Sequence, residues 1–270
     1  MLYFSDVTSA ASHAGWLGDS GADKVEMMDY ASLRSYLGQK MDGADSTAEI
    51  MDKIASLIPQ LKALKGLTGM DNFTHTVAQR ELLWKMRNGI FPCVAGVRVP
   101  GATVILEDVV APVGSLDRLV GGMQALFDKH GYEGAIFGHA RDGNIHPLLT
   151  SPIGNPDVLR NFRGFVDEMV DLVLKLDGSL KGEHGTGRAI APFVAREWGD
   201  DIYQLMRRVK KLADPEGILN PGNSFRKAPA TSSPHFTLDA SLVMISGIDR
   251  VCALICVDPP KSRSSIYRQG

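Results

Sequence analysis

A predicted β-hairpin in the middle of the chain most constrains how this protein can fold. Tyr132–Gly138 is an apolar stretch typical of a buried strand, and Asn144–Leu149 is typical of a second strand. The dipeptide Asp142-Gly143 lies between them and favours a tight turn. The first strand runs into His139 and the second contains His146. The hairpin therefore places two histidines on neighbouring strands.

A second segment, rich in glycine, carries further polar side chains. Gly182–Arg188 reads Gly-Glu-His-Gly-Thr-Gly-Arg and follows a predicted amphipathic helix. Its three glycines allow the backbone to approach a ligand closely, where a Cβ atom would collide. If this stretch is extended, the neighbouring side chains of Glu183 and His184 point to opposite sides. One of them can then bind a metal while the other faces a reacting atom.

Together the two segments supply the ligands of a divalent metal ion. Imidazole nitrogen and carboxylate oxygen are ligands that zinc, manganese and ferrous iron share. We predict that His139, His146 and Glu183 hold such an ion, with coordination positions left open for a substrate. His184 is then available as a catalytic base. A lone histidine is more often a surface or core residue than a ligand, so the prediction depends on the two segments occurring together.

Helical and strand-like segments alternate along the chain. Apolar spacing predicts helices over 46–64, 77–87, 116–130, 158–176 and 202–212, and a β-branched stretch predicts a strand over 102–110. We expect Ser115 and Gly131 to cap the third of these helices. No Rossmann fingerprint accompanies the alternation. The order fits an α+β architecture, in which an antiparallel sheet is covered by helices on one side.

Composition fits one soluble domain, or one domain with a tail. The chain has 270 residues, of which 44% are hydrophobic, so it can bury a sizeable core. A net charge of −2 gives no electrostatic reason to expect nucleic acid. We found neither a signal peptide nor an apolar run of about 18 residues, so we expect no transmembrane segment. A cytoplasmic location follows, with peripheral attachment to the inner face of the membrane left open.

The cysteines exclude a disulfide framework. Cys93, Cys252 and Cys256 are few and scattered, which favours a reducing compartment. Three residues separate Cys252 from Cys256, and no companion completes the spacing of a ferredoxin. We therefore expect no iron–sulfur cluster in this chain.

Motifs that follow one another in a fixed order resemble the C-terminal, substrate-binding domain of FAD-linked oxidases. They are Phe137–Pro147, Gly178–Pro192 and Leu212–Gly222. This family includes D-lactate, D-2-hydroxyglutarate and glycolate dehydrogenases of the vanillyl-alcohol oxidase fold. Three more stretches resemble the large bacterial members that carry an iron–sulfur segment: Leu83–Arg87, Thr103–Val109 and Ala191–Val194.

The resemblance implies a cap domain with a ferredoxin-like fold, over residues 1–222, in an enzyme that oxidises a D-2-hydroxy acid to the 2-oxo acid. We leave residues 223–270 unassigned, as a disordered or aberrant tail. Family members carry a flavin-binding domain before this one, and no glycine-rich pyrophosphate-binding stretch precedes Leu83. FAD would then be shared with a missing or separate flavin-domain polypeptide, with Asn220 and Gly222 on the returning segment as cofactor-binding residues.

Three further residues are candidates for binding the substrate. A guanidinium can hold a carboxylate by two parallel hydrogen bonds, so an arginine beside the metal is expected. Arg87 stands where family members place a substrate-binding arginine, and Arg98 lies on the approach to the strand at 103. Either could instead be a solvated surface charge. Asn144 can hydrogen-bond the substrate, orient a ligand or simply form part of the turn.

Two other functions remain open from the sequence. In a metal-dependent hydrolase, Glu183 or His184 would activate a water bound to zinc. In an inactive truncated remnant, the domain would bind a metal or an oxidase partner without turnover. The flavin-docking motif Asn220-Pro221-Gly222 argues against hydrolysis, whereas the missing flavin domain favours a remnant.

Overall fold

The fold is built on an eight-stranded sheet. The computed structural model describes residues 1–22, 24–29, 57–71, 77–96, 98, 102–152, 156–221 and, as backbone, 252–257. The strands are β1 (Leu2–Phe4), β2 (Lys24–Met28), β3 (Leu67–Met70), β4 (Thr103–Leu106), β5 (Val109–Val110), β6 (Ala135–His139), β7 (Asn144–Ser151) and β8 (Cys252–Val257). Their order is β3-β1-β8-β2-β6-β7-β4, and β5 pairs with β7.

Most neighbouring strands are antiparallel, as expected. The predicted hairpin is confirmed, because β6 and β7 pair antiparallel and place Phe137 opposite His146. On the other side of β6, the antiparallel strand β2 places Glu26 opposite His139. The exception is β8, which runs parallel to both β1 and β2. This strand lies in the segment that we had left unassigned, beyond residue 222.

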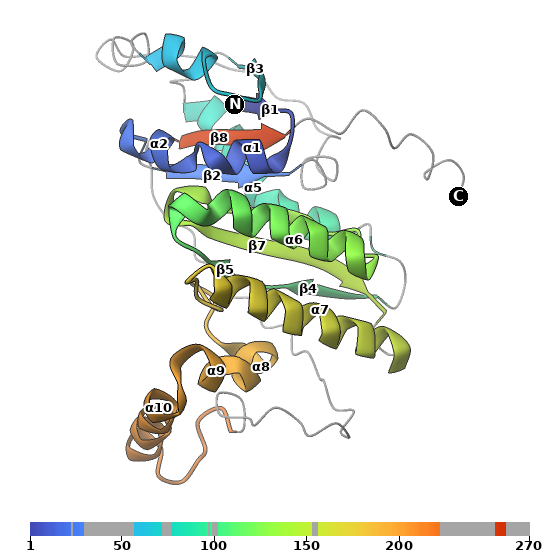
Figure 1. Cartoon of the computed structure of the whole chain (residues 1–270), viewed down its shortest axis with the longest axis vertical. Helices are drawn as coiled ribbons and strands as arrows, with labels where there is room; N and C mark the ends of the chain where they lie inside the picture. The colour runs from blue at the N-terminus through green and yellow to red at the C-terminus, as the bar shows by residue number, and fades with distance from the viewer. Residues whose placement is uncertain are drawn as a thin grey trace.

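Helices lie against both faces of the sheet (Figure 1). They are α1 (Val7–Ser12), α2 (Ala14–Asp19), α5 (Val77–Gly96), α6 (Leu116–His130), α7 (Pro156–Lys175), α8 (Gly187–Ile190), α9 (Val194–Trp198) and α10 (Asp200–Ala213). Residues 57–62 are also helical, whereas 46–56 lie outside the described part of the chain. The α+β class and the predicted helices at 77, 116, 158 and 202 are confirmed.

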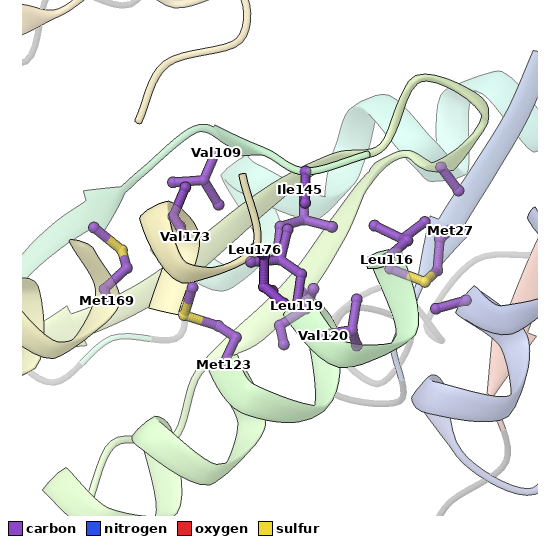
Figure 2. Packing of buried hydrophobic residues seen from close by; sticks show 14 of the residues in the cluster. Met27, Val109, Leu116, Leu119, Val120, Met123, Ile145, Met169, Val173 and Leu176 are labelled. Carbon is purple, nitrogen blue, oxygen red and sulfur yellow. The ribbon is translucent and has the colours of Figure 1, made fainter. Parts of the chain in front are cut away.

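The larger core fills the space between one face of the sheet and the helices α1, α2, α6 and α7. Figure 2 shows Leu119 and Met123 of α6, Val173 of α7 and Ile145 of β7 among the side chains of this cluster. All four side chains are fully buried. Complete burial of an aliphatic side chain contributes about 1.5–3 kcal/mol relative to exposure, so this layer dominates the stability of the fold.

The second face of the sheet is covered by α5, which differs from the expectation of helices on one side only. Ile90 of α5 belongs to a separate buried cluster, whose other members are Met28, Ala135, Phe137 and Leu148. The reason is strand alternation: successive residues of β2, β6 and β7 point to opposite faces, and both sets contain large apolar side chains.

Two local features differ from the sequence-based expectation. The strand predicted over 102–110 is divided into β4 and β5, with Glu107 and Asp108 between them. Gly131 ends α6 in the left-handed conformation at φ 70°, as expected. The side chain of Ser115 makes no capping hydrogen bond and instead accepts one from Arg118. In the described residues, no helix is long and apolar enough to cross a membrane.

Candidate metal and catalytic site

The candidate site lies on the face of the sheet that α5 covers. On β2, Glu26 shares this face with Met28, and on β6 His139 shares it with Phe137, because alternate residues of a strand point the same way. His146 of β7 belongs to the same face, and its ring lies 5.3 Å from that of Phe137. Glu26, His139 and His146 therefore lie on the same face as the smaller apolar cluster and next to it.

Two histidines converge on one carboxylate oxygen. His139 Nε2 lies 3.0 Å and His146 Nε2 lies 3.2 Å from Oε1 of Glu183. Two ligands bound to one ion at about 2.0–2.2 Å lie about 3 Å apart, so these distances suit a shared divalent cation. Their ligand atoms form one of the groups in the described residues that are close enough to hold a metal ion. The structure thus brings together all three predicted ligands.

Asp108 holds the loop that carries Glu183. Its Oδ2 atom accepts backbone hydrogen bonds from Gly182 (2.9 Å), Glu183 (2.7 Å) and His184 (2.8 Å). At Gly182, an added Cβ would lie within 2.9 Å of Asp108, Asn144 and Val110. The loop can therefore wrap this closely around the carboxylate only if residue 182 is glycine.

This wrapped loop corrects the expectation that Glu183 and His184 point to opposite sides. The stretch is bent around Asp108 and is not extended. Glu183 Oε1 lies 3.7 Å from His184 Nε2, and both side chains face His146. The rings of His146 and His184 are stacked, with centroids 4.8 Å apart.

A second ligand group shares His146 with the first. Asp108, His146 and His184 also offer ligand atoms close enough to hold an ion. The oxygens of Asp108, however, are already used. Oδ2 accepts three backbone hydrogen bonds, and Oδ1 accepts one from Asn144 at 2.6 Å. We therefore favour the group that contains Glu183 as the metal site.

Arg87 and Glu26 form a pair beside the two histidines. Glu26 is buried, and its Oε1 atom accepts a hydrogen bond of 2.6 Å from His139 Nδ1. Its Oε2 atom accepts a hydrogen bond of 2.8 Å from Arg87 Nε. The guanidinium of Arg87 also lies 4.8 Å from the ring centroid of Phe137. Arg87, predicted to bind the substrate, is thus connected to His139 through one side chain.

The charges of the site shift the ionisation of its groups. A hydrogen bond from His146 lowers the pKa of Glu183 to about 2, with the nearby histidines adding to the effect. Burial raises the pKa of Glu26, but the hydrogen bond from His139 and the charge of Arg87 outweigh it, so the net pKa is lowered. The hydrogen bond to Glu26 raises the pKa of His139, whereas burial lowers the pKa of His146. Both carboxylates are therefore ionised at neutral pH, as a metal site requires.

An open cavity of about 250 Å³ borders these groups. Its lining residues are Lys24, Val25, Glu26, His139, Asp142 and Glu183. The cavity thus borders two of the predicted metal ligands, and its volume suits a small molecule rather than a polymer.

The other predicted site residues lie in different surroundings. Asn144 is buried and donates hydrogen bonds to Asp108 and to the carbonyl of Val109. It therefore orients Asp108, which in turn holds the loop that carries Glu183. Arg98 is exposed and donates a hydrogen bond to the carbonyl of Ala95. At 1.5 Å per residue, Ala95 lies about 12 Å along α5 from Arg87. Asn220 lies after α10 at φ 46°, and Gly222 is outside the described residues.

Sequence reasoning missed Glu26 and Asp108. Each had a signal, because each is a charged residue within an apolar stretch that was otherwise typical of a strand. A carboxylate in such a position is costly to bury unless it is paired, and it therefore marks a buried polar cluster.

Comparisons with known proteins identify the family of this chain. The family of FAD linked oxidases, C-terminal domain, matches residues 4–224. The glycolate oxidase subunit GlcD of Bacillus subtilis (strain 168) is 29% identical over 197 residues, which cover 73% of this chain and 40% of that protein. A mitochondrial D-lactate dehydrogenase (cytochrome) of Arabidopsis thaliana is 30% identical over 151 residues, covering 56% of this chain and 26% of that protein.

A solved structure of p-cresol methylhydroxylase with substrate bound aligns with a TM-score of 0.46 and 15% identity, over 84% of this chain and 52% of that one. The present chain matches less than half of the length of the two enzymes named above. The family match, by contrast, covers most of the chain and includes the strands and the loop that carry the three histidines. The protein therefore belongs to the FAD linked oxidases and matches their C-terminal domain.

Proposed function

We propose that this chain forms the substrate- and metal-binding part of an FAD-dependent enzyme that oxidises a D-2-hydroxy acid to the 2-oxo acid. The observation that carries the proposal is the convergence of His139 Nε2 and His146 Nε2 on one oxygen of Glu183. The relatives named for glycolate and D-lactate support a small 2-hydroxy acid as the substrate. The adjoining cavity of about 250 Å³ agrees with a substrate of that size.

His139, His146 and Glu183 would hold the divalent ion. Zinc, manganese and iron all accept this donor set of two imidazoles and a carboxylate. A bound ion would supply charge stabilisation and would lower the pKa of a hydroxyl group that it contacts. Glu183 and the buried Asp108 contribute negative charge around this position, and Asp108 keeps the Glu183 loop in place.

Arg87 is the arginine best placed to bind the substrate carboxylate. Its Nε atom donates to Glu26, whereas the two Nη nitrogens have no hydrogen-bond partner among the described residues. They are thus available for two hydrogen bonds to a carboxylate. Arg98 is exposed and lies beyond the end of α5, so we assign it no role in the pocket.

His184 would take the proton of the substrate hydroxyl. Its side chain is partly exposed, and its ring is held parallel to that of His146. His184 Nε2 lies 3.7 Å from Oε1 of the proposed ligand Glu183, so the base would act on a substrate atom close to the ion. Bound FAD would supply the acceptor for the hydride.

A flavin domain would complete the active site. The apolar residues of α10 form an exposed stripe together with Trp198 of α9, and we call this the α10 stripe: Trp198, Ile202, Leu205, Val209 and Leu212. Ile218 and Leu219 are also exposed and lie next to the predicted cofactor-binding residue Asn220. A run of apolar residues on one helix face normally packs against another surface. We propose the flavin domain as that surface.

Metal analysis tests the proposed site. Purified protein dialysed against Mn²⁺ or Zn²⁺ should retain about one ion per chain, as expected for one group of three ligands. The double variant His139→Ala, His146→Ala should lose most of it. His130→Ala is a matched control, because His130 pairs with Glu168 on α7 and lies outside the site. Equal metal content in the wild type and the double variant would contradict the assignment.

A further inference from the structure

We propose that Glu26 is a positioning residue of the metal site, which fixes the imidazole of His139 so that its Nε2 atom faces the ion. The inference rests on the proposed function, because it takes His139 as a metal ligand. Glu26 touches neither the predicted ion nor the reacting atoms. Its effect would be exerted through the orientation and tautomer of one ring.

Glu26 is buried as a charged group and uses both of its oxygens. Its relative exposure is 1%, and burial of an unpaired carboxylate would be costly. Oε1 accepts the hydrogen bond from His139 Nδ1 at 2.6 Å, and Oε2 accepts the one from Arg87 Nε at 2.8 Å. Two charge-assisted hydrogen bonds thus hold the carboxylate in one rotamer.

The sheet sets the relation between Glu26 and His139. They are direct cross-strand partners in the antiparallel pairing of β2 and β6, although 113 positions separate them along the chain. Directly opposite residues have their side chains on the same face of the sheet. A slip of one residue would move Glu26 to the other face, so the register of two buried strands specifies the contact.

The hydrogen bond to Glu26 determines which nitrogen of His139 can bind a metal. Because an ionised carboxylate only accepts hydrogen bonds, Nδ1 carries the proton. Nε2 is then the ligand atom, and it is Nε2 that lies 3.0 Å from Glu183 Oε1. Carboxylates that accept from the second nitrogen of a ligand histidine orient the ring and raise its basicity. Arg87 balances the charge of Glu26 and occupies its other oxygen.

The two histidines need this support to different extents. The side chain of His146 is 3% exposed and is packed between the rings of Phe137 and His184. Its Nδ1 atom has no hydrogen-bond partner, and the nearest carboxylate oxygen, Asp108 Oδ1, lies 3.6 Å away. His139 is 30% exposed. We infer that packing orients His146, whereas the hydrogen bond to Glu26 orients His139.

Metal titration of the full chain tests the inference. Glutamine at position 26 offers one acceptor to two donors, so Glu26→Gln should weaken Mn²⁺ and Zn²⁺ binding by about 10–100-fold, the usual effect of losing such a partner. Glu26→Asp keeps both acceptors on a shorter side chain and should recover part of the affinity. Glu168→Gln is the matched control, because Glu168 also contacts a lysine and a histidine but lies on α7. Its metal affinity should equal that of the wild type.

A measurement on the unmodified protein keeps the inference testable if Glu26→Gln does not fold. In the Zn²⁺-loaded wild type, ¹⁵N NMR should show His139 bound through Nε2, with an Nδ1 proton protected from exchange by its hydrogen bond. Metal on Nδ1, or a freely exchanging Nδ1 proton, would overturn the inference. Equal metal affinities for a folded Glu26→Gln variant and the wild type would overturn it as well, with the metal site intact. A wild type that binds neither ion would overturn the metal site itself and this inference with it.

Discussion

His184 is the histidine of the site that is best suited to exchange protons with a substrate. Its side chain is more exposed than those of His139 and His146, yet stacking on His146 limits its orientations. A general base needs both properties, since it must reach the substrate and also hold a defined geometry. His146 has the opposite environment, because burial lowers its pKa and favours the neutral form that a metal ligand requires.

We therefore expect His184→Ala to lower turnover of the flavin-complemented enzyme by roughly 10²–10⁴-fold, the contribution of a positioned general base. Metal content should stay at the wild-type level, because the favoured ligand group does not include His184. Steady-state kinetics and metal analysis of the same preparation check both points. Loss of the metal together with activity would instead make His184 a ligand, in the alternative group with Asp108 and His146.

Asp108 supports the site through the backbone. We expect Asp108→Asn to destabilise the protein by about 1–3 kcal/mol, because an amide would direct its NH₂ group toward existing donors, either the loop N–H groups or Asn144. Metal affinity should fall as well, since Glu183 would lose its anchor. Urea unfolding and metal titration measure the two effects. Asp171→Asn, in an exposed pair with Arg196, should change the stability by less than about 1 kcal/mol. A similar small change at Asp108 would contradict the anchoring role.

At the scale of elements, the sequence predicted what depends on local pattern. The apolar spacing of α6, α7 and α10 and the turn between β6 and β7 are local signals, and each led to the correct element. The hairpin also brought together His139 and His146. Glu26 could not be placed with them, because only the order β2-β6-β7 makes it the partner of His139. Strand order depends on packing between distant segments, which residue spacing does not reveal.

The left-handed end of α6 offers a test at this scale. Gly131 has φ 70°, and a Cβ atom added there would meet nothing within 4 Å. Gly131→Ala should therefore destabilise by about 1–2 kcal/mol through backbone strain alone. Gly114 is the matched control, since a Cβ there also meets nothing within 4 Å and its φ is outside the left-handed range. Thermal unfolding compares the two variants. Equal stabilities of the Gly131 and Gly114 variants would show that backbone strain at position 131 does not affect the free energy of unfolding.

At the scale of the whole molecule, the polar site and the α10 stripe differ in their surroundings: the polar groups have partners within the fold, whereas the apolar side chains of the stripe are exposed. Two predicted metal ligands lie on strands of the sheet and the third lies on the adjoining loop, and two buried carboxylates support them. The α10 stripe is apolar and exposed, with Leu212 84% exposed. Figure 1 shows α10 beyond the edge of the sheet and away from the helices that cover it. We therefore propose that the described residues supply the metal ligands, and that the α10 stripe is the surface on which a flavin domain docks.

We expect the isolated 270-residue chain to purify colourless and to leave D-lactate, D-2-hydroxyglutarate and glycolate unoxidised when FAD and a dye acceptor are added. Turnover should appear when a flavin-domain polypeptide from a related enzyme is supplied. Leu205→Glu should weaken that complementation, because it places a charge in the middle of the α10 stripe, while stability changes by no more than about 0.5 kcal/mol at an exposed position. Titration of the chain into the flavin-domain polypeptide measures the affinity.

Gln204→Glu is the matched control, because it introduces the same charge on the neighbouring exposed residue, about 100° around the helix from Leu205. Its affinity for the flavin domain should stay near that of the wild type, since the charge lies off the stripe. If both variants bind as tightly as the wild type, the flavin domain docks elsewhere and α10 has another partner. A yellow preparation of the chain alone, with about one equivalent of flavin, would contradict the need for a second domain, because the cofactor contacts would then lie within these residues.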